Sequence, residues 1–167
     1  MKNHLLVAVI AVVLAGCASF DGRGLVPGQS TAKDVEALMG VPAERIKLAD
    51  GDTNWYYPRQ PIGRMMYAVR MSPGGVMRSK EQLLTEQNIA LLYRDTTTRE
   101  QARVIVGPPW QVSRFERQQR EVWEYYMFNA ELYDYFLYLQ FSDDGILREV
   151  MMLKDYAKEP GHDGGKD

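Results

Sequence analysis

The chain has 167 residues, of which 46% are hydrophobic and 25% charged, and its formal net charge is −2. This balance gives no electrostatic basis for binding nucleic acid or for a strongly basic contact with a membrane. Aromatic residues make up 11% of the chain, which excludes a chain that is disordered throughout.

Residues 1–16 have the pattern of a bacterial lipoprotein signal peptide. Lys2 precedes an apolar run from residue 5 to residue 14, which is too short to span a bilayer comfortably. The following Leu14-Ala15-Gly16-Cys17 resembles a lipobox, in which cleavage leaves Cys17 as the lipidated first residue. An ordinary signal peptide with an incidental cysteine is the alternative. Because Cys17 is the only cysteine, no disulfide can form within the chain.

The residues after Cys17 predict which membrane holds the protein and where its tether lies. Ala18 and Ser19 stand where an aspartate would favour retention at the inner membrane. For a bacterium with two membranes, we therefore expect an outer-membrane, lipid-anchored protein that faces the periplasm. Residues 17–27 are interpreted as a tether rich in helix breakers, and the Gly-rich, charged residues 157–167 as a disordered tail.

A short helix with marked ends is predicted after the tether. Ser30 or Thr31 can cap its first turn, and residues 35, 38 and 39 form one apolar stripe. Gly40 and Pro42 end it. A second such helix follows at residues 97–106, where Thr97 and Glu100 predict a capping box and Gly107-Pro108-Pro109 ends the helix.

The two helices belong to a longer internal repeat. Gly40 and Gly107 lie 67 residues apart, and Trp55 and Trp123 lie 68 residues apart. Repetition at a nearly fixed spacing predicts two copies of one unit. We assign the copies to residues 28–85 and 86–156. The predicted structural anchors of the repeat are Gly40, Pro42, Trp55, Gly107, Pro109 and Trp123.

Alternating and aromatic segments predict the strands of each copy. They are residues 53–57, 65–71 and 76–84 in the first copy and residues 112–115, 121–128, 132–142 and 146–153 in the second. Residues 46–52 are interpreted as a strand end and turn, and residues 86–93 as a short helix. The expected fold class is α+β, with antiparallel sheets that carry helices on one face.

The chain offers little for catalysis. Its two histidines, His4 and His162, lie in the predicted signal peptide and tail, so the predicted folded region has no imidazole and no free thiol. Serine and cysteine nucleophiles activated by histidine and the usual zinc ligand sets are thereby excluded. The acidic pairs at positions 50 and 52 and positions 143 and 144 flank turn glycines and are interpreted as turn residues. We expect no enzyme, metal or cofactor.

A mixed aromatic and polar strand face is the candidate binding surface. Alternation in residues 132–142 places Phe136 and Tyr138 on the less apolar face, and the repeat gives Met66 and Arg70 as their counterparts. Such residues are enriched at protein interfaces, which predicts partner binding by these four. The alternatives are a face buried between the two halves and a solvated aromatic face.

The order of these motifs resembles the SmpA/OmlA (BamE-like) outer-membrane lipoprotein family. The residues that carry the resemblance are Gly28-Gln29-Ser30, Val35, Leu38, Gly40, Pro42, Trp55-Tyr56-Tyr57 and Gly75-Val76, then Thr96-Thr97-Thr98, Ala102, Ile105, Gly107-Pro108-Pro109, Trp123, Phe141 and Gly145.

The resemblance implies both a fold and a function. Family members have a helix-helix-three-strand unit and an accessory role in the complex that inserts β-barrel proteins into the outer membrane. The tandem arrangement is similar to β-lactamase-inhibitor proteins, whose paired units form a concave binding sheet. The expected function is thus protein–protein interaction, with the β-barrel assembly machinery as partner. A periplasmic inhibitor or ligand-binding module that uses a concave sheet is the alternative.

Overall fold

The computed structural model describes residues 21–156. The predicted signal peptide, Cys17 and residues 157–167 lie outside the described residues. In chain order the elements are α1 (Ala32–Met39), β1 (Glu44–Lys47), β2 (Thr53–Pro58), β3 (Met66–Met71), β4 (Met77–Gln82), α2 (Glu86–Ile89), α3 (Arg99–Val106), β5 (Gln111–Phe115), η2 (Glu116–Gln118), β6 (Arg120–Phe128), β7 (Asp134–Phe141) and β8 (Leu147–Lys154).

The strands form two antiparallel sheets of four strands each, in the orders β1-β2-β3-β4 and β5-β6-β7-β8. The predicted helix-helix-three-strand repeat is therefore wrong, because the described chain is mostly antiparallel sheet with three short α-helices. The extra strand of the first sheet, β1, carries no apolar run, since it is a short edge strand with half-buried and exposed residues in alternation. Its pairing with β2, rather than its composition, makes it a strand.

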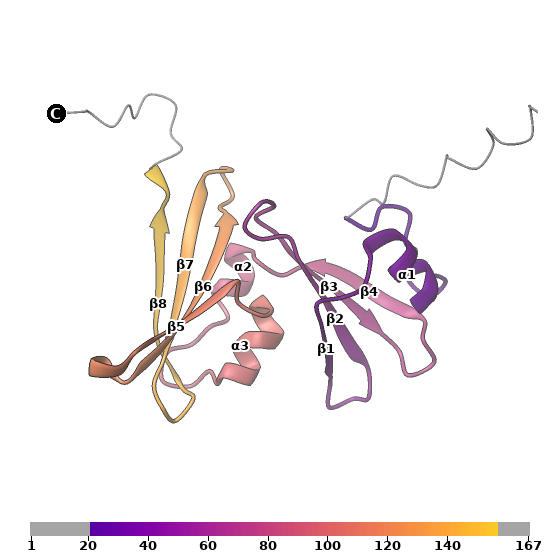
Figure 1. Cartoon of the computed structure of the whole chain (residues 1–167). Helices are drawn as coiled ribbons and strands as arrows, with labels where there is room; N and C mark the ends of the chain where they lie inside the picture. The colour runs from indigo at the N-terminus through magenta and orange to yellow at the C-terminus, as the bar shows by residue number, and fades with distance from the viewer. Residues whose placement is uncertain (1–20, 157–167) are drawn as a thin grey trace, which may run out of the picture.

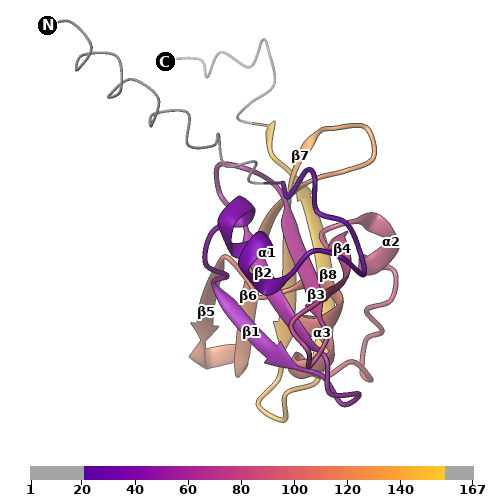
Figure 2. The same cartoon turned by 90° about the vertical axis from the view of Figure 1, so that its right-hand side faces the viewer.

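The sheets and helices stack in layers (Figures 1 and 2). The β5–β8 sheet lies on the left in Figure 1, α2 and α3 lie between the two sheets, and α1 covers the far face of the β1–β4 sheet. Both faces of the first sheet are thus covered. The β5–β8 sheet has helices on one face only. Its other face, which we name the outer face, carries no described helix or strand, and the loop between β2 and β3 contacts it at one end.

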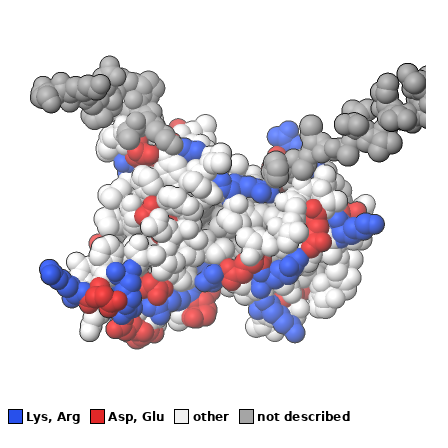
Figure 3. Space-filling model, in the orientation of Figure 1, with Lys and Arg blue, Asp and Glu red and all other residues white. Residues whose placement is uncertain are grey.

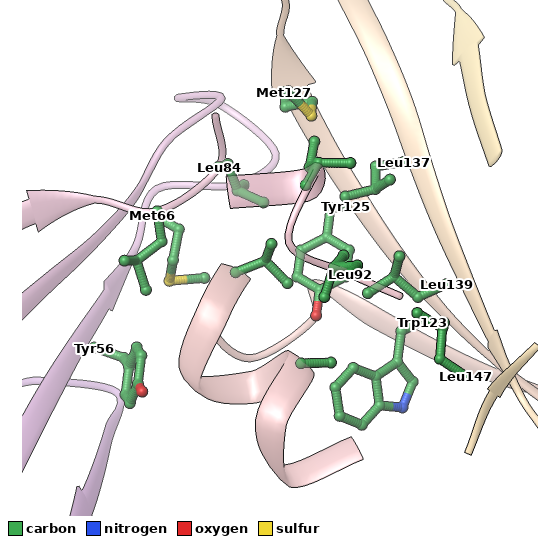
Figure 4. Close-up of a cluster of buried hydrophobic side chains, with 14 of the residues drawn as sticks. Tyr56, Met66, Leu84, Leu92, Trp123, Tyr125, Met127, Leu137, Leu139 and Leu147 are labelled. Carbon is green, nitrogen blue, oxygen red and sulfur yellow. The ribbon is translucent and has the colours of Figure 1, made fainter. Parts of the chain in front are cut away.

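A single core joins the two halves. Tyr56 and Met66 of the first sheet pack in one buried cluster with Val106 of α3 and with Trp123 and Tyr125 of β6. Figure 4 shows the first two residues on one side of α3 and the last two on the other. Burial of large apolar side chains is the main favourable term in folding, so the halves stabilise each other.

A second, smaller core lies beneath α1. Val35 and Met39 of the helix pack against a buried set on the facing strands, which comprises Tyr57, Val69, Met71 and Met77. Two of the residues predicted as the apolar stripe of this helix are therefore its fully buried residues.

The two eight-residue helices, α1 and α3, each begin at a capping box. Thr31 caps α1, and its backbone amide donates to the Asp34 carboxylate at 2.8 Å. In α3 the cap is Thr98, whose amide donates to Gln101 Oε1 at 2.9 Å. The predicted Thr97 box is wrong, because Thr97 is buried and its hydroxyl accepts from the Tyr93 amide instead.

The predicted anchors occupy different environments. Trp123 is buried, with its ring centroid 4.7 Å from that of Phe141. Trp55 is half-buried beneath the Arg45 guanidinium, which lies 4.6 Å from the ring centroid. Gly40 and Gly107 follow the two helices with positive φ angles, and the prolines at positions 42 and 109 are buried and half-buried.

Candidate functional site

The structure separates the four predicted partner-binding residues. Met66 is 0% exposed in the shared core, which leaves none of its surface for a partner. The Arg70 guanidinium donates from Nε to Asp52 at 2.7 Å and also contacts Asp50. The face of the first sheet that carries both residues lies against the second half.

The other two predicted residues lie together on the outer face. Phe136 and Tyr138 are half-buried neighbours on β7, with ring centroids 6.2 Å apart. Phe136 also stacks on Tyr126 of β6, at a centroid distance of 4.7 Å. Cross-strand aromatic pairs of this kind stabilise a sheet and form a flat apolar surface.

The strand register extends this surface into rows. Tyr138 pairs with Glu124 on one side and with Met151 on the other, and Phe136 pairs with Leu153. Because directly paired residues point to the same side of a sheet, these side chains share the outer face. Leu153 is 47% exposed, so apolar area on this face stays open to solvent.

The outer face is hollowed beside the β5–β6 hairpin. The hollow has a volume of about 280 Å³, and it is the only one of the described hollows to which strands β5, β6, β7 and β8 all contribute. Its lining is Ser113, Phe115, Gln118, Val122, Glu124, Tyr138, Gln140, Met151 and Leu153.

Glu124 is the charged group in this lining. Burial raises the pKa of its carboxyl, and burial followed by the charge of Glu124 raises the pKa of the Tyr138 hydroxyl. No described residue forms an ion pair with Glu124. On the same strand, Arg120 directs a guanidinium hydrogen bond to the Gln119 carbonyl oxygen at 3.4 Å. The hollow therefore combines aromatic surface with a carboxylate that lacks a cation.

A loop from the first half fixes one end of the outer face. Arg64 donates to Asp134 at 2.8 Å, and its guanidinium lies 4.4 Å from the centroid of the Tyr126 ring. The Tyr126 hydroxyl donates to Asp155 at 2.8 Å, and its amide donates to Gln60 Oε1 at 3.1 Å. The aromatic row is thus held in place from both sheets.

Sequence reasoning missed Glu124, Tyr126 and Arg64. The alternation within the predicted strand 121–128 carries a signal for the first two, because even-numbered residues there share one face. Arg64 has no such signal, since its partner Asp134 is 70 residues away.

The acidic pairs lie in turn networks. Asp52 accepts from Arg70 and Arg78, and Asp144 accepts from the backbone amide of Ile146. Within residues 21–156, no group of three or more His, Cys, Asp or Glu side chains is arranged to hold a metal ion. The same residues include no helix of the length and apolarity that crossing a membrane requires.

Fold and site together define a two-sheet protein in which one aromatic sheet face is uncovered. No family model matches the chain, and no curated protein matches it. One similar solved structure is a DUF4309 family protein (YjgB) from Bacillus subtilis, with 16% identity and a TM-score of 0.30, covering 83% of this chain and 91% of that chain. We draw neither fold nor function from a likeness at this level.

Proposed function

We propose that the chain is a lipid-anchored protein of the bacterial envelope that binds another protein on the outer face of the β5–β8 sheet. One observation carries the proposal: Tyr138, Met151 and Leu153 on that face line an open hollow, whereas Met66 and Ala68, on the corresponding face of the first sheet, are buried in the shared core. Contiguous apolar surface of this kind marks binding sites. The lipobox ending at Cys17 supports the anchor.

The hollow favours a partner that inserts a basic side chain. A lysine or arginine would supply the cation that Glu124 lacks and would lie against the Tyr138 ring. Because the carboxylate is partly desolvated, this pairing is stronger than one at an exposed rim. The partner is thus a protein segment that presents Lys or Arg to an aromatic surface.

The resemblance to BamE-like lipoproteins suggests the β-barrel assembly machinery as the partner. The hollow on the outer face supports a second candidate, an inhibitor or ligand-binding module for a periplasmic protein. Both candidates use the same surface, so they differ in the partner rather than in the site.

Crosslinking in intact cells tests the surface and identifies the partner. A photoreactive amino acid replaces Tyr138 or Met151 on the outer face, and Lys33 on the exposed side of α1 is the control. We expect the two outer-face positions to capture the same protein and the control to capture none of it. Assembly subunits would support the accessory role, and a soluble periplasmic protein would support the second candidate. Equal capture from Lys33 would contradict the proposal.

The charge of the hollow is tested with the identified partner. Glu124→Gln removes the charge and keeps the shape, and we expect it to weaken binding about tenfold or more. Glu149→Gln, which removes an exposed carboxylate from the same face, is the matched control and should have little effect. An unchanged dissociation constant for Glu124→Gln would reject the basic side chain as the contact.

A further inference from the structure

Exposed apolar residues gather at one end of the molecule. Ile62 is 89% exposed in the loop after β2, Leu132 is 74% exposed in the loop after β6, and Tyr156 is 59% exposed just beyond β8. Figures 1 and 2 both show these loops at the top, at the end where the described chain begins. We name this the tethered end and define it by residues Ile62, Leu132, Tyr133 and Tyr156.

Specific contacts hold the segments of the tethered end together. Asp21 and Ile62 line one hollow of about 470 Å³, and Lys80 donates to the Asp21 carbonyl oxygen at 2.6 Å. At the other side of this end, the Asp155 amide donates to the Asp134 carbonyl oxygen at 2.9 Å. The Arg64–Asp134 ion pair joins the two sides. These contacts fix the exposed side chains relative to the first described residue.

The length of the preceding chain places this end near a membrane. Cys17 lies four residues before Asp21, and four fully extended residues span at most about 14 Å. Acyl chains on Cys17, which the proposed function requires, would hold Asp21, at this end of the molecule, within that distance of the lipid. The opposite end of the molecule has no such restraint.

The chemistry of the tethered end suits a lipid interface. The tethered end carries two exposed aliphatic side chains and two exposed tyrosines, and the Lys154 ammonium lies 4.0 Å from the centroid of the Tyr133 ring. Tyrosine and lysine are typical of the membrane–water boundary, where the ring enters the headgroup layer and the amine stays in water. In the view of Figure 3, a band of charged side chains runs along the lower part of the molecule, and further charged side chains lie in its upper part.

We propose that the tethered end docks on the bilayer surface and inserts Ile62, Leu132, Tyr133 and Tyr156 among the lipid headgroups. The proposal rests on the lipid anchor of the proposed function and adds an orientation to it. The long axes of strands β6 and β7 are then steeply inclined to the membrane plane. In this orientation the outer face points sideways, toward a partner in the same membrane.

Fluorescent probes at defined positions test the docking. The full lipoprotein is reconstituted in vesicles of phosphatidylethanolamine and phosphatidylglycerol, with a single new cysteine from Ile62→Cys or Leu132→Cys carrying an environment-sensitive dye. Glu116→Cys is the matched control, because the Glu116 side chain is 80% exposed and follows Phe115, which pairs with Arg120 at the far end of β6. That end of β6 is roughly 27 Å along the strand from its other end.

The expected result is a blue-shifted emission, quenched by nitroxide-labelled lipid, at positions 62 and 132 and a solvent-like emission at position 116. Mass spectrometry of the same samples reports acylation of Cys17, and thermal unfolding reports the fold. Acylated protein with solvent-like emission at all three positions would overturn the docking and leave the anchor standing. An unacylated Cys17 would overturn the anchor, and the docking with it.

Discussion

At the scale of single residues, Gly107 of the second half lies close against Met66 of the first half. It follows α3 with a φ of 85° and a ψ of 179°, a conformation that is essentially restricted to glycine. A Cβ atom at this position would lie 2.5 Å from Met66 Cγ. Gly40 has a similar backbone after α1, but a Cβ there would meet no atom within 4 Å.

This pair of glycines separates backbone strain from packing. We expect Gly40→Ala to lower the free energy of unfolding by about 1–3 kcal/mol through strain alone. Gly107→Ala should cost more, because it also displaces Met66 from the shared core. Denaturant unfolding measures both. A Met66→Ala substitution should cost less in the Gly107→Ala protein than in the original, since it removes the clash. Equal losses for the two glycines would refute the close contact.

The same residues show what the sequence could predict. The positions of Gly40 and Gly107 as helix ends followed from local chemistry, and the structure confirms both. Phe136 and Tyr138 were correctly placed on one strand face by alternation. Met66 also lies on the predicted face of its strand, but that face is buried against α3. Alternation assigns side chains to a face, and only the packing of the halves decides which face stays open.

At the scale of elements, strong apolar alternation in the sequence predicts the long strands. The short strand β1 and the exact cap of α3 leave weaker signals, and the sequence does not predict them correctly. The predicted strand 121–128 corresponds to β6, and residues 146–153 correspond to β8 within one residue at each end. The sequence predicts only a strand end and turn at residues 46–52, whereas the structure has the strand β1 at Glu44–Lys47, because a short edge strand with no apolar face leaves little signal. The predicted cap of α3, Thr97, lies one residue before the observed cap, Thr98. Three consecutive threonines stand at this point, and each has the hydroxyl that a cap requires.

Asp52, just before β2, forms ion pairs with arginines of β3 and β4, and these ion pairs predict that the stability of the fold depends on pH. Asp52 is 4% exposed and accepts from Arg70 of β3 and Arg78 of β4. Burial alone would raise the pKa of this carboxyl, but the two arginine hydrogen bonds outweigh it and hold the pKa below its ordinary value of 3.8. A lowered pKa in the folded state stabilises the fold above the ordinary value, and the stabilisation disappears as the pH falls through the folded-state pKa.

We therefore expect Asp52→Asn to lower the thermal midpoint at neutral pH by an amount that shrinks on acidification below about pH 4. Thermal unfolding of both proteins over a pH series measures the difference. Glu116→Gln, which removes a carboxylate whose side chain is 80% exposed, is the control and should change the neutral-pH midpoint little. If the thermal midpoint of Asp52→Asn stays below that of the original protein by the same amount at every pH of the series, the ion pairs with the arginines are not the cause of the difference.

At the scale of the whole molecule, polar links between the halves accompany the shared core. Arg103 of α3 donates to Glu44 of β1 at 2.7 Å, and Arg64 pairs with Asp134 through side chains that are each 15% exposed. Because Tyr56 and Met66 share a core with Trp123, separating the halves would expose large apolar side chains. The two sheets should therefore unfold in one cooperative transition.

The Arg64–Asp134 pair tests how strongly the halves are linked. Its burial lies between that of surface pairs and that of fully buried pairs, so Arg64→Ala should lower the free energy of unfolding by about 1–3 kcal/mol. Glu36→Gln removes the exposed partner of Arg45 and should cost about 0–1 kcal/mol. Urea unfolding followed by near-ultraviolet circular dichroism and by backbone hydrogen exchange measures both quantities. If Arg64→Ala splits the transition in two, with the β5–β8 sheet surviving alone, the ion pair rather than the shared core would be what makes the halves one folding unit.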